Sequence, residues 1–448
     1  MMPAKTTNKN MTILRQMCEL IPTHLVPKLA NEHGVAFRDY SPWSHVVTHI
    51  YCHLFRAVGL NDVCDAMGLF TSKLRAIRGA TAPKRNTLSH ANKNRSSGMA
   101  KDLYWTMLDL LQKTDPTFTR HGGKRRGFIK RFRRSIHAVD STTIELVANC
   151  MSWAKHRRRK AAAKCHMNLD LASMLPRYAV VGSAKDADAK RAWEVCAPLR
   201  AGEIVVFDKA YLAFDHLWEL HDRGVFWVNR TKTNTRLKVI KVIRGAKNPR
   251  VLKDEWVRLT DPKSAKSYPE VLRRVTVRVE LDGEEKVMEF LTNNLEWSPW
   301  TIAELYRARW EIEVFFKELK QTLKLVDFIG YSQNAVEWQI WMALLVHLLM
   351  RFLAHLSKWE RSFTRLFTLL RASLWHNYPL RAFLESYGTA NTPYRLCACP
   401  NQLYLPGIGA PQEYPVGQPK RRKRSQSRKY REFMQRKNEA QPENKGQK

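Results

Sequence analysis

Four residues in the stretch 301–325 have the types and the spacing needed for chemistry at a phosphate. They are Tyr306, Arg309, Glu313 and Lys320. On a helix these positions fall within a band roughly 60° wide. A carboxylate flanked by two cations and a phenol could hold a metal ion beside a phosphate group. The alternative is a solvated face whose charges form ion pairs, which is the more common meaning of such a stripe.

Two aspartates upstream lie in or directly after predicted strands, at positions where α/β proteins commonly bind ligands. Asp140 lies in a predicted strand within 135–146, and Asp208 follows 203–207, an apolar and β-branched run typical of a buried strand. Ligands bind at strand ends of α/β sheets, although an aspartate after a strand is more often a turn or cap residue. With Glu313 they form a set of three carboxylates, as needed to hold two Mg²⁺ ions about 4 Å apart for phosphoryl transfer.

The composition indicates a folded protein with a polyanionic partner. The chain has 448 residues, enough for two or three domains, and 44% of them are hydrophobic. Lys and Arg number 76 against 41 Asp and Glu, which gives a net charge of +35. DNA or RNA explains this excess better than a membrane surface, because no basic amphipathic anchor stands out.

The cysteines and the apolar runs favour an intracellular protein that does not act on a membrane. The eight cysteines are scattered, and Cys397 and Cys399 without a second pair make a poor zinc signature, so reduced thiols are expected. The first residues lack the apolar core of a signal peptide. The most apolar run, 340–350, is too short to span a bilayer and predicts a buried helix.

The elements that would position the three carboxylates differ along the chain. Pro299 precedes the stretch 301–325, whose good helix formers and apolar spacing predict one continuous helix. The block 224–296 is rich in predicted strands, with Asp282-Gly283 as a hairpin turn signal, and is expected to lie outside the main sheet. The other carboxylates of the long helix are expected to be surface charges: Glu304, Glu311 and Glu318.

The N-terminal part, from about 11 to 115, is predicted to be helical. Short helices at 61–69 and 72–78 precede a polar and basic segment, an order that resembles a helix-turn-helix DNA reader. A small helical bundle gives the same pattern and is the alternative. The candidate DNA contacts in this segment are Arg85, Asn92 and Arg95.

Two further basic segments are candidates for contact with the DNA backbone. The connector 119–134 is either a solvated linker or a segment that grips phosphates, and the tail with its basic run 420–431 is expected to be disordered and to add unspecific affinity. The predicted organisation has five parts: a helical DNA-binding domain (1–118), a first catalytic part (119–223), a β-rich insertion (224–296), a second catalytic part with C-terminal helices (297–400) and a basic tail (401–448).

These motifs resemble those of the DDE transposases of bacterial insertion sequences. The stretch 306–320 matches without a gap the Tyr-x2-Arg-x3-Glu-x6-Lys signature of the subgroup called YREK. AVDSTTIEL, at 138–146, matches the first-aspartate motif, and VVFDKAYLAF, at 205–214, matches the second. The basic stretch between them resembles the link between the family's strands, and the resemblance covers about residues 12 to 370.

The resemblance implies a ribonuclease H-like catalytic domain interrupted by a β-rich insertion, with a helical N-terminal DNA-binding domain. It implies that Asp140, Asp208 and Glu313 bind two Mg²⁺ ions, for which Mn²⁺ can substitute. It further implies a homodimer in a synaptic complex with double-stranded DNA, in the cytoplasm of a bacterium at the nucleoid. The residues that it places against DNA are Tyr306, Arg309, Lys320, Tyr211 and Lys164.

The sequence departs from the family's pattern at two positions. The residue two after the second aspartate is usually Gly and here is Ala210. If the backbone there needs a positive φ, alanine costs about 1 kcal/mol or more. Where some relatives hold a flipped base with a Trp, the aligned residue is Met288, so no base-flipping residue is assigned.

The leading hypothesis is therefore a transposase that binds the terminal inverted repeats of its own element. It would cleave the 3′ ends by metal-assisted hydrolysis and join them to target DNA. One alternative is a nuclease of the same fold that performs no strand transfer. Another is a DNA-binding relative without catalytic activity, against which the presence of all three carboxylates argues.

Overall fold

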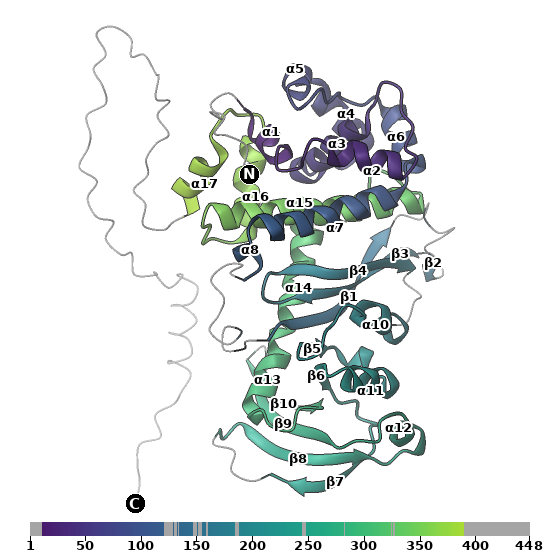
Figure 1. Cartoon of the computed structure of the whole chain (residues 1–448), viewed down its shortest axis with the longest axis vertical. Helices are drawn as coiled ribbons and strands as arrows, with labels where there is room; N and C mark the ends of the chain where they lie inside the picture. Colours follow the sequence, from purple (N-terminus) through teal and green to yellow (C-terminus); the bar gives the residue numbers. More distant parts are fainter. Residues whose placement is uncertain are drawn as a thin grey trace, which may run out of the picture. The chain divides into compact units, whose positions relative to one another are not determined.

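The computed structural model describes residues 11–388 apart from several short segments. Those segments are 121–128, 130, 131, 133, 147–149, 151–154, 158–159, 184–187, 244–247, 282, 324 and 326–327. The described residues form one compact unit, in which a helical region lies next to a large sheet (Figure 1). Most of the predicted basic connector and the whole predicted tail 401–448 lie outside the described residues.

The strands that carry the two aspartates belong to one ten-stranded sheet, in the order β2-β3-β1-β5-β6-β10-β9-β8-β7, with β4 paired to β3. The edge strand β2 is Lys155–Arg157. Three strands are antiparallel neighbours: β1 (Ile136–Leu146), β3 (Lys160–Asp170) and β4 (Leu175–Ser183). The next two, β5 (Ile204–Phe207) and β6 (Phe226–Arg230), run parallel to β1. All four residues of β5 are buried, as predicted for its apolar, β-branched sequence.

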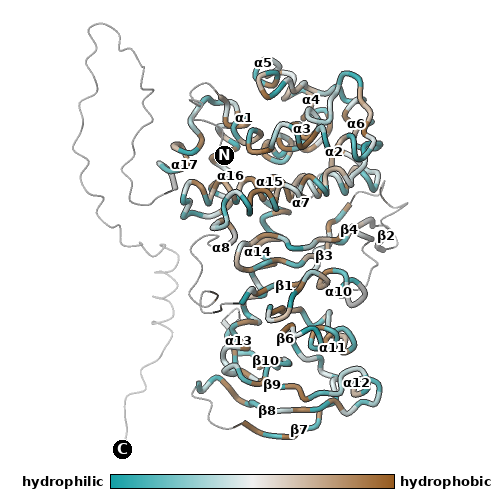
Figure 2. Tube along the Cα trace, viewed as in Figure 1, coloured by the Kyte–Doolittle hydropathy of each residue, from teal (hydrophilic) through white to brown (hydrophobic). Residues whose placement is uncertain are grey.

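The β-rich block continues this sheet, and the prediction that it lies outside the main sheet is wrong. β10 (Glu284–Thr292) pairs with β6, and β9 (Leu272–Leu281), β8 (Val251–Leu259) and β7 (Leu237–Val242) follow in order. The antiparallel pairing of β9 with β10 confirms the predicted hairpin, and Gly283 has the positive φ of 81° that favours glycine in such a turn. Figure 2 shows hydrophobic residues along β7 at the far edge of the sheet.

The two faces of the sheet pack against different helices because successive side chains of a strand point to opposite faces. On one face, α13 (Pro299–Ala308) and α14 (Trp310–Lys317) share a core with Ile136, Ala138 and Val206. On the other face, α10 (Asp188–Cys196) and α11 (Phe214–Asp222) share a core with Val139, Val205 and Phe207. This alternation in β1 directs Asp140, two residues after Ala138, toward α13 and α14.

The stretch 301–325 is not the single helix that its sequence predicts. It is divided at Arg309, where the backbone bonds tighten to a three-residue spacing, with the N–H of Arg309 bonded to the carbonyl of Tyr306. After α14, a π-helical turn (η5, Glu318–Thr322) carries a five-residue bond from the N–H of Leu323 to the carbonyl of Glu318. Such a turn contains an extra residue, so Lys320 leaves the stripe formed by Arg309 and Glu313.

The N-terminal helices form one core with the C-terminal helices. α15 (Gln333–Leu356) packs against α7 (Ser97–Thr114), α3 (Pro42–Phe55) and α6 (Arg85–Asn94). The predicted boundaries at 118 and 297 therefore separate segments that share a hydrophobic core. The remaining helices of this region are α1 (Ile13–Cys18), α2 (Leu25–Glu32), α4 (Leu60–Gly68), α5 (Thr71–Arg75), α8 (Thr117–Arg120), α16 (Phe363–Ser373) and α17 (Leu380–Gly388).

α15 is longer than the apolar run that predicts it. Within the described residues it is the one helix whose length and composition would allow it to cross a membrane. The most apolar part of α15 is 78% buried inside the protein, as in the core helix of a folded domain. The packing against α7 and α3 accounts for this burial.

Candidate active site

Asp140 and Asp208 lie side by side at one level of the sheet. In the parallel pair β1 and β5, Val139 is opposite Phe207. The aspartates follow these residues directly, so they occupy adjacent positions on strands about 5 Å apart. This register gives the two predicted carboxylates a common location.

Arg230 occupies the same level on the third parallel strand and is not one of the predicted site residues. Phe207 of β5 is opposite Asn229 of β6, so Arg230 comes next to Asp208. β6 is a largely apolar strand that ends on a charged residue, and β5 is an apolar strand that a charged residue follows directly. That repeated pattern is the signal in the sequence from which Arg230 could have been found.

Arg309 joins Glu313 to Asp140. One guanidinium nitrogen of Arg309 donates to Asp140 Oδ2 at 2.9 Å, and another donates to Glu313 Oε1 at 2.7 Å. The Arg309 side chain is only 12% exposed, so its charge is weakly screened by solvent. Glu313 on α14 and Asp140 on β1 are far apart in the sequence, and they are connected through this side chain.

Asp140 is buried and is affected by the charges of its neighbours. Burial raises the pKa of Asp140 to about 6; the Ser141 N–H and Arg309 lower it, and the charges of Asp208 and Glu313 raise it. The N–H of Ser141 donates to Asp140 Oδ1 at 2.7 Å. Asp208 and Glu313 are therefore both close enough to Asp140 to act on its charge.

Tyr306 forms part of the wall of this site. Its ring lies 4.7 Å from that of Phe290, centroid to centroid, and the Arg309 guanidinium lies 5.7 Å from the Tyr306 ring. Burial raises the pKa of Tyr306, and the charges of Asp208 and Arg230 also act on this phenol. Tyr306 is 9% exposed, so it can offer only a small part of its surface to a ligand.

Two predicted DNA contacts lie farther along β1 and β3. Burial lowers the pKa of Lys320, and the charge of Glu145 in β1 opposes this effect. Lys164 pairs with Thr143 in the antiparallel register of β3 with β1 and is half-buried. Both cations are thus associated with the strand that bears Asp140, beyond the position of the aspartate.

Tyr211 and Ala210 follow Asp208 in a short 3₁₀ helix, η4 (Lys209–Tyr211). Tyr211 is fully buried, and its hydroxyl lies 3.3 Å from His166 Nδ1, so burial argues against the predicted DNA contact. Ala210 is not among the residues with positive φ in the described part of the chain. The strain expected from alanine at this position is therefore absent, because the backbone does not adopt the left-handed conformation.

Asn92 and Arg95 hold α6 in place, and their burial argues against the predicted DNA contacts. Asn92 is 2% exposed, and its Oδ1 lies 2.8 Å from His45 Nε2 and 3.0 Å from His49 Nε2. Arg95 is 8% exposed and donates to the backbone carbonyls of Ser41 and Tyr40. The third candidate of this segment, Arg85 at the start of α6, is exposed.

Glu318 is not the surface charge that the sequence predicts. Its Oε2 lies 3.0 Å from His347 Nε2 and accepts from Arg351 at 2.6 Å, and its side chain is 14% exposed. Burial opposes its charge, but His347 and Arg351 outweigh burial and lower the pKa of Glu318. This cluster fastens the turn after α14 to α15.

The donor chemistry of the site suits a magnesium ion. Asp140, Asp208 and Glu313 provide the hard oxygen ligands that Mg²⁺ prefers. Within the described ranges, no three His, Cys, Asp or Glu side chains are arranged to hold a metal ion. The Arg309 guanidinium supplies positive charge between Asp140 and Glu313. A metal held by both carboxylates would therefore require this side chain to shift.

Comparison with known proteins relates the chain to transposases. The family described as "Transposase DDE domain" matches residues 131–349, which include all three carboxylates, and a domain of unknown function, DUF4372, matches residues 9–77. The chain is 32% identical over 277 residues to y4zB of Sinorhizobium fredii, a protein named as a transposase; the match covers 60% of this chain and 75% of that one.

Other transposases show weaker similarity. The transposase of insertion sequence element IS5377 from Geobacillus stearothermophilus is 27% identical, over 50% of this chain and 58% of that protein. A piggyBac transposase in a synaptic complex with hairpin DNA aligns with 86% of this chain at 10% identity and a TM-score of 0.41, and the alignment covers 87% of the piggyBac chain. The similarity to the Sinorhizobium protein and the matched domain show that the chain belongs to the DDE transposase family.

Proposed function

We propose that this chain is the transposase of an insertion sequence, which binds the terminal inverted repeats, cleaves the 3′ ends and joins them to target DNA. The observation that carries the proposal is the position of Asp140, which lies beside Asp208 in the sheet and shares Arg309 with Glu313. Asp140 and Asp208 are adjacent through the parallel register of β1 and β5. Arg309 links Glu313 to Asp140.

The topology of the sheet supports a ribonuclease H-like core. The order β4-β3-β1-β5-β6 consists of three antiparallel strands followed by two parallel ones. The strands β7 to β10 then form the addition that the family resemblance implies, and they extend the sheet beyond β6 through the pairing of β10 with β6. The sequence from Tyr306 to Lys320 supports membership of the YREK subgroup, with Tyr306, Arg309 and Glu313 gathered at the site.

In this proposal the three carboxylates hold two Mg²⁺ ions, with Mn²⁺ as a substitute. When bound, these ions would activate the attacking water or 3′-hydroxyl and stabilise the leaving oxygen. The same site performs both steps. In each step an in-line attack forms one phosphorus–oxygen bond while another breaks.

The cations of the chain would position the DNA. Arg309 can grip a phosphate with two parallel hydrogen bonds, and Arg230 and Lys320 supply further positive charge beside the aspartates and along β1. A DNA phosphate would attract Arg309 away from the carboxylates, and this would leave them available for metal. We further propose that the protein works in the bacterial cytoplasm as a homodimer on two element ends, as the family resemblance implies.

Cleavage and joining can be tested together. Purified protein is mixed with a duplex carrying the sequences that flank its own gene, a supercoiled target plasmid and Mg²⁺. We expect nicked end DNA and end DNA joined to the plasmid, and neither product with Asp208→Ala. Nicking without joining would favour a nuclease. Tight binding with no products would favour a DNA-binding relative without catalysis.

A further inference from the structure

The exposed side of α6 is a polar surface that is not part of the candidate active site. Seven of the ten residues of this helix are exposed, and all seven are polar: Arg85, Asn86, Thr87, Ser89, His90, Lys93 and Asn94. The buried side of the helix packs against α4 and α15 through Leu88, Ala91 and Asn92. α6 is therefore firmly seated while it presents a continuous polar face.

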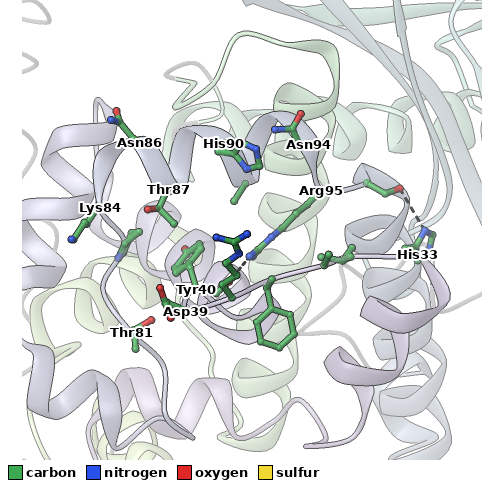
Figure 3. A pocket seen from close by; sticks show the side chains of 18 of the residues that line it. His33, Asp39, Tyr40, Thr81, Lys84, Asn86, Thr87, His90, Asn94 and Arg95 are labelled. Carbon is green, nitrogen blue, oxygen red and sulfur yellow. Dashed lines mark hydrogen bonds between the residues drawn. The ribbon is translucent and has the colours of Figure 1, made fainter.

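A groove of about 1270 Å³ runs along this face. Figure 3 shows Asn86, His90 and Asn94 along one side of the groove, and Asp39, Tyr40 and Thr81 on the other. Arg95 crosses the groove to the Tyr40 carbonyl and so ties the two sides together. The groove is thus open and has a fixed floor.

The charge around α6 favours a polyanion as its occupant. Residues 66–101 contain eight Lys or Arg and no Asp or Glu. Lys84 and Arg38 contribute cations to the groove, against the single carboxylate of Asp39. Phe37, 55% exposed, also lines the groove.

Three of the exposed residues have the spacing and chemistry to read bases. Asn86, His90 and Asn94 are four residues apart, so they lie along one stripe of the helix. A helix about 10 Å wide fits the major groove of B-DNA, and the Asn carboxamide can pair with the edge of adenine. In the described part of the chain, the three side chains have no interaction with other residues and are free to contact a ligand.

We infer that α6 is the sequence-reading helix of this protein. Asn86, His90 and Asn94 contact base edges in the major groove, while Arg85, Lys93 and Lys84 contact the flanking phosphates. This inference rests on the proposed function, in which the protein recognises element ends. It assigns specificity to a segment that lies just outside the matched domain of unknown function.

The test is a comparison of affinities for two DNA duplexes, measured with the full chain in the absence of divalent metal. One labelled duplex carries the sequence at the ends of the protein's own gene, and the other carries the same bases in scrambled order. Asn86→Ala, His90→Ala and Asn94→Ala should each lower the preference for the end duplex by about fivefold or more. The triple variant should bind both duplexes with nearly equal affinity.

Arg85→Ala combined with Lys93→Ala is the matched control on the same helix. Loss of phosphate contacts should weaken binding to both duplexes equally and flatten its dependence on salt, with the preference unchanged. A triple variant that is folded and keeps the wild-type preference would overturn the inference. If the triple variant fails to fold, wild-type Lys84 and Lys93 are labelled chemically with and without the end duplex. Protection of both lysines by the end duplex would support the inference, and absence of protection would overturn it.

Failure of this inference is distinguishable from failure of the proposed function. If wild-type protein cleaves and joins the end duplex in Mg²⁺ while the triple variant keeps its preference, the transposase proposal stands and α6 is not the reader. If wild-type protein neither cleaves the end duplex nor prefers it, both proposals fall.

Discussion

Arg309 and Asp140 are 169 residues apart in the chain, and their side chains meet at 2.9 Å. The guanidinium also lies 2.7 Å from Glu313, one turn farther along the helical segment. A single cation therefore connects β1 to α14, beside the position where Asp208 follows β5. We expect the arrangement of the site to depend on the shape of this side chain as well as on its charge.

Arg309→Lys should reduce DNA cleavage by about tenfold to a hundredfold. The lysine keeps the positive charge, but its ammonium lacks the planar fork that reaches two carboxylates at once. Loss of one hydrogen bond between charged groups costs about 1.5–3 kcal/mol, which corresponds to this range. The measurement is the initial rate of nicking of the end duplex in Mg²⁺.

Arg307→Lys is the control for this change. Arg307 is exposed on the preceding turn, and its nitrogen lies 3.8 Å from Glu304. The nicking rate of Arg307→Lys should stay within about twofold of wild type, because exposed ion pairs contribute little to stability. Similar losses in the two variants would show that the bridge made by Arg309 has no special role.

Glu318→Ala should destabilise the protein by about 3 kcal/mol. The substitution leaves His347 and Arg351 of α15 without the carboxylate that pairs with them in a largely buried position. Removal of one partner from such a cluster is costly because the remaining charge stays desolvated. Urea denaturation gives the free energy of unfolding. In the control Glu311→Ala the change should be within about 0.5 kcal/mol, and equal effects would mean that Glu318 is a surface charge after all.

His216→Phe should make the stability of the protein less sensitive to acid. His216 is fully buried between Trp193 and Phe207, and neither ring nitrogen has a hydrogen-bond partner among the described residues. Burial lowers the pKa of His216 to about 4, whereas in the unfolded chain it is near 6.5. Between these pH values the unfolded state binds the proton more readily, so stability falls as the pH falls, by about 1.4 kcal/mol per unit for this group.

Thermal melts between pH 7 and pH 5 measure this dependence. The melting temperature of wild type should fall more steeply with acid than that of His216→Phe. In the exposed control His24→Gln the slope should match wild type. Parallel slopes for wild type and His216→Phe would contradict the assignment of a buried neutral imidazole.

Asn92→Ala should lower stability by about 3 kcal/mol and leave DNA preference unchanged. Asn92 connects His45 and His49 to the backbone carbonyl of Ile329, at 3.2 Å from its Nδ2, and all these groups are buried. Its loss leaves several buried polar groups without partners. Asn94→Ala, two residues away on the exposed side, should leave stability unchanged and alter the preference. The reverse pattern would restore Asn92 as a DNA contact.

The sequence was most informative where short strands end on charged residues. The apolar run 204–207 predicts a buried strand with Asp208 at its end, and the structure has β5 there. The register that brings Asp208 beside Asp140 could not be predicted, because pairing between strands depends on the packing of both faces. The same register explains why Arg230, on a strand assigned to an insertion, was overlooked.

The sequence predicts the helices less completely than the strands, because the course of a helix and its buried side depend on contacts with residues far away in the chain. Helical spacing predicts one stripe from Tyr306 to Lys320, but the π-helical turn at 318–322 and its attachment to α15 move Lys320 off that stripe. The polar composition of 83–97 suggests DNA contact throughout. Only the packing against α3 and α15 reveals that Asn92 and Arg95 face inward while their neighbours face out.

The central claim is that Glu313 completes a metal-dependent cleavage site with Asp140 and Asp208. The most direct test compares wild type, Glu313→Gln and Glu311→Gln in the nicking of the end duplex with Mg²⁺, with binding of the same duplex measured in parallel. The account predicts that Glu313→Gln binds the duplex but produces no nicks above background, while Glu311→Gln cleaves at a rate within about twofold of wild type. Undiminished cleavage by Glu313→Gln, or equal loss in the two variants, would contradict it.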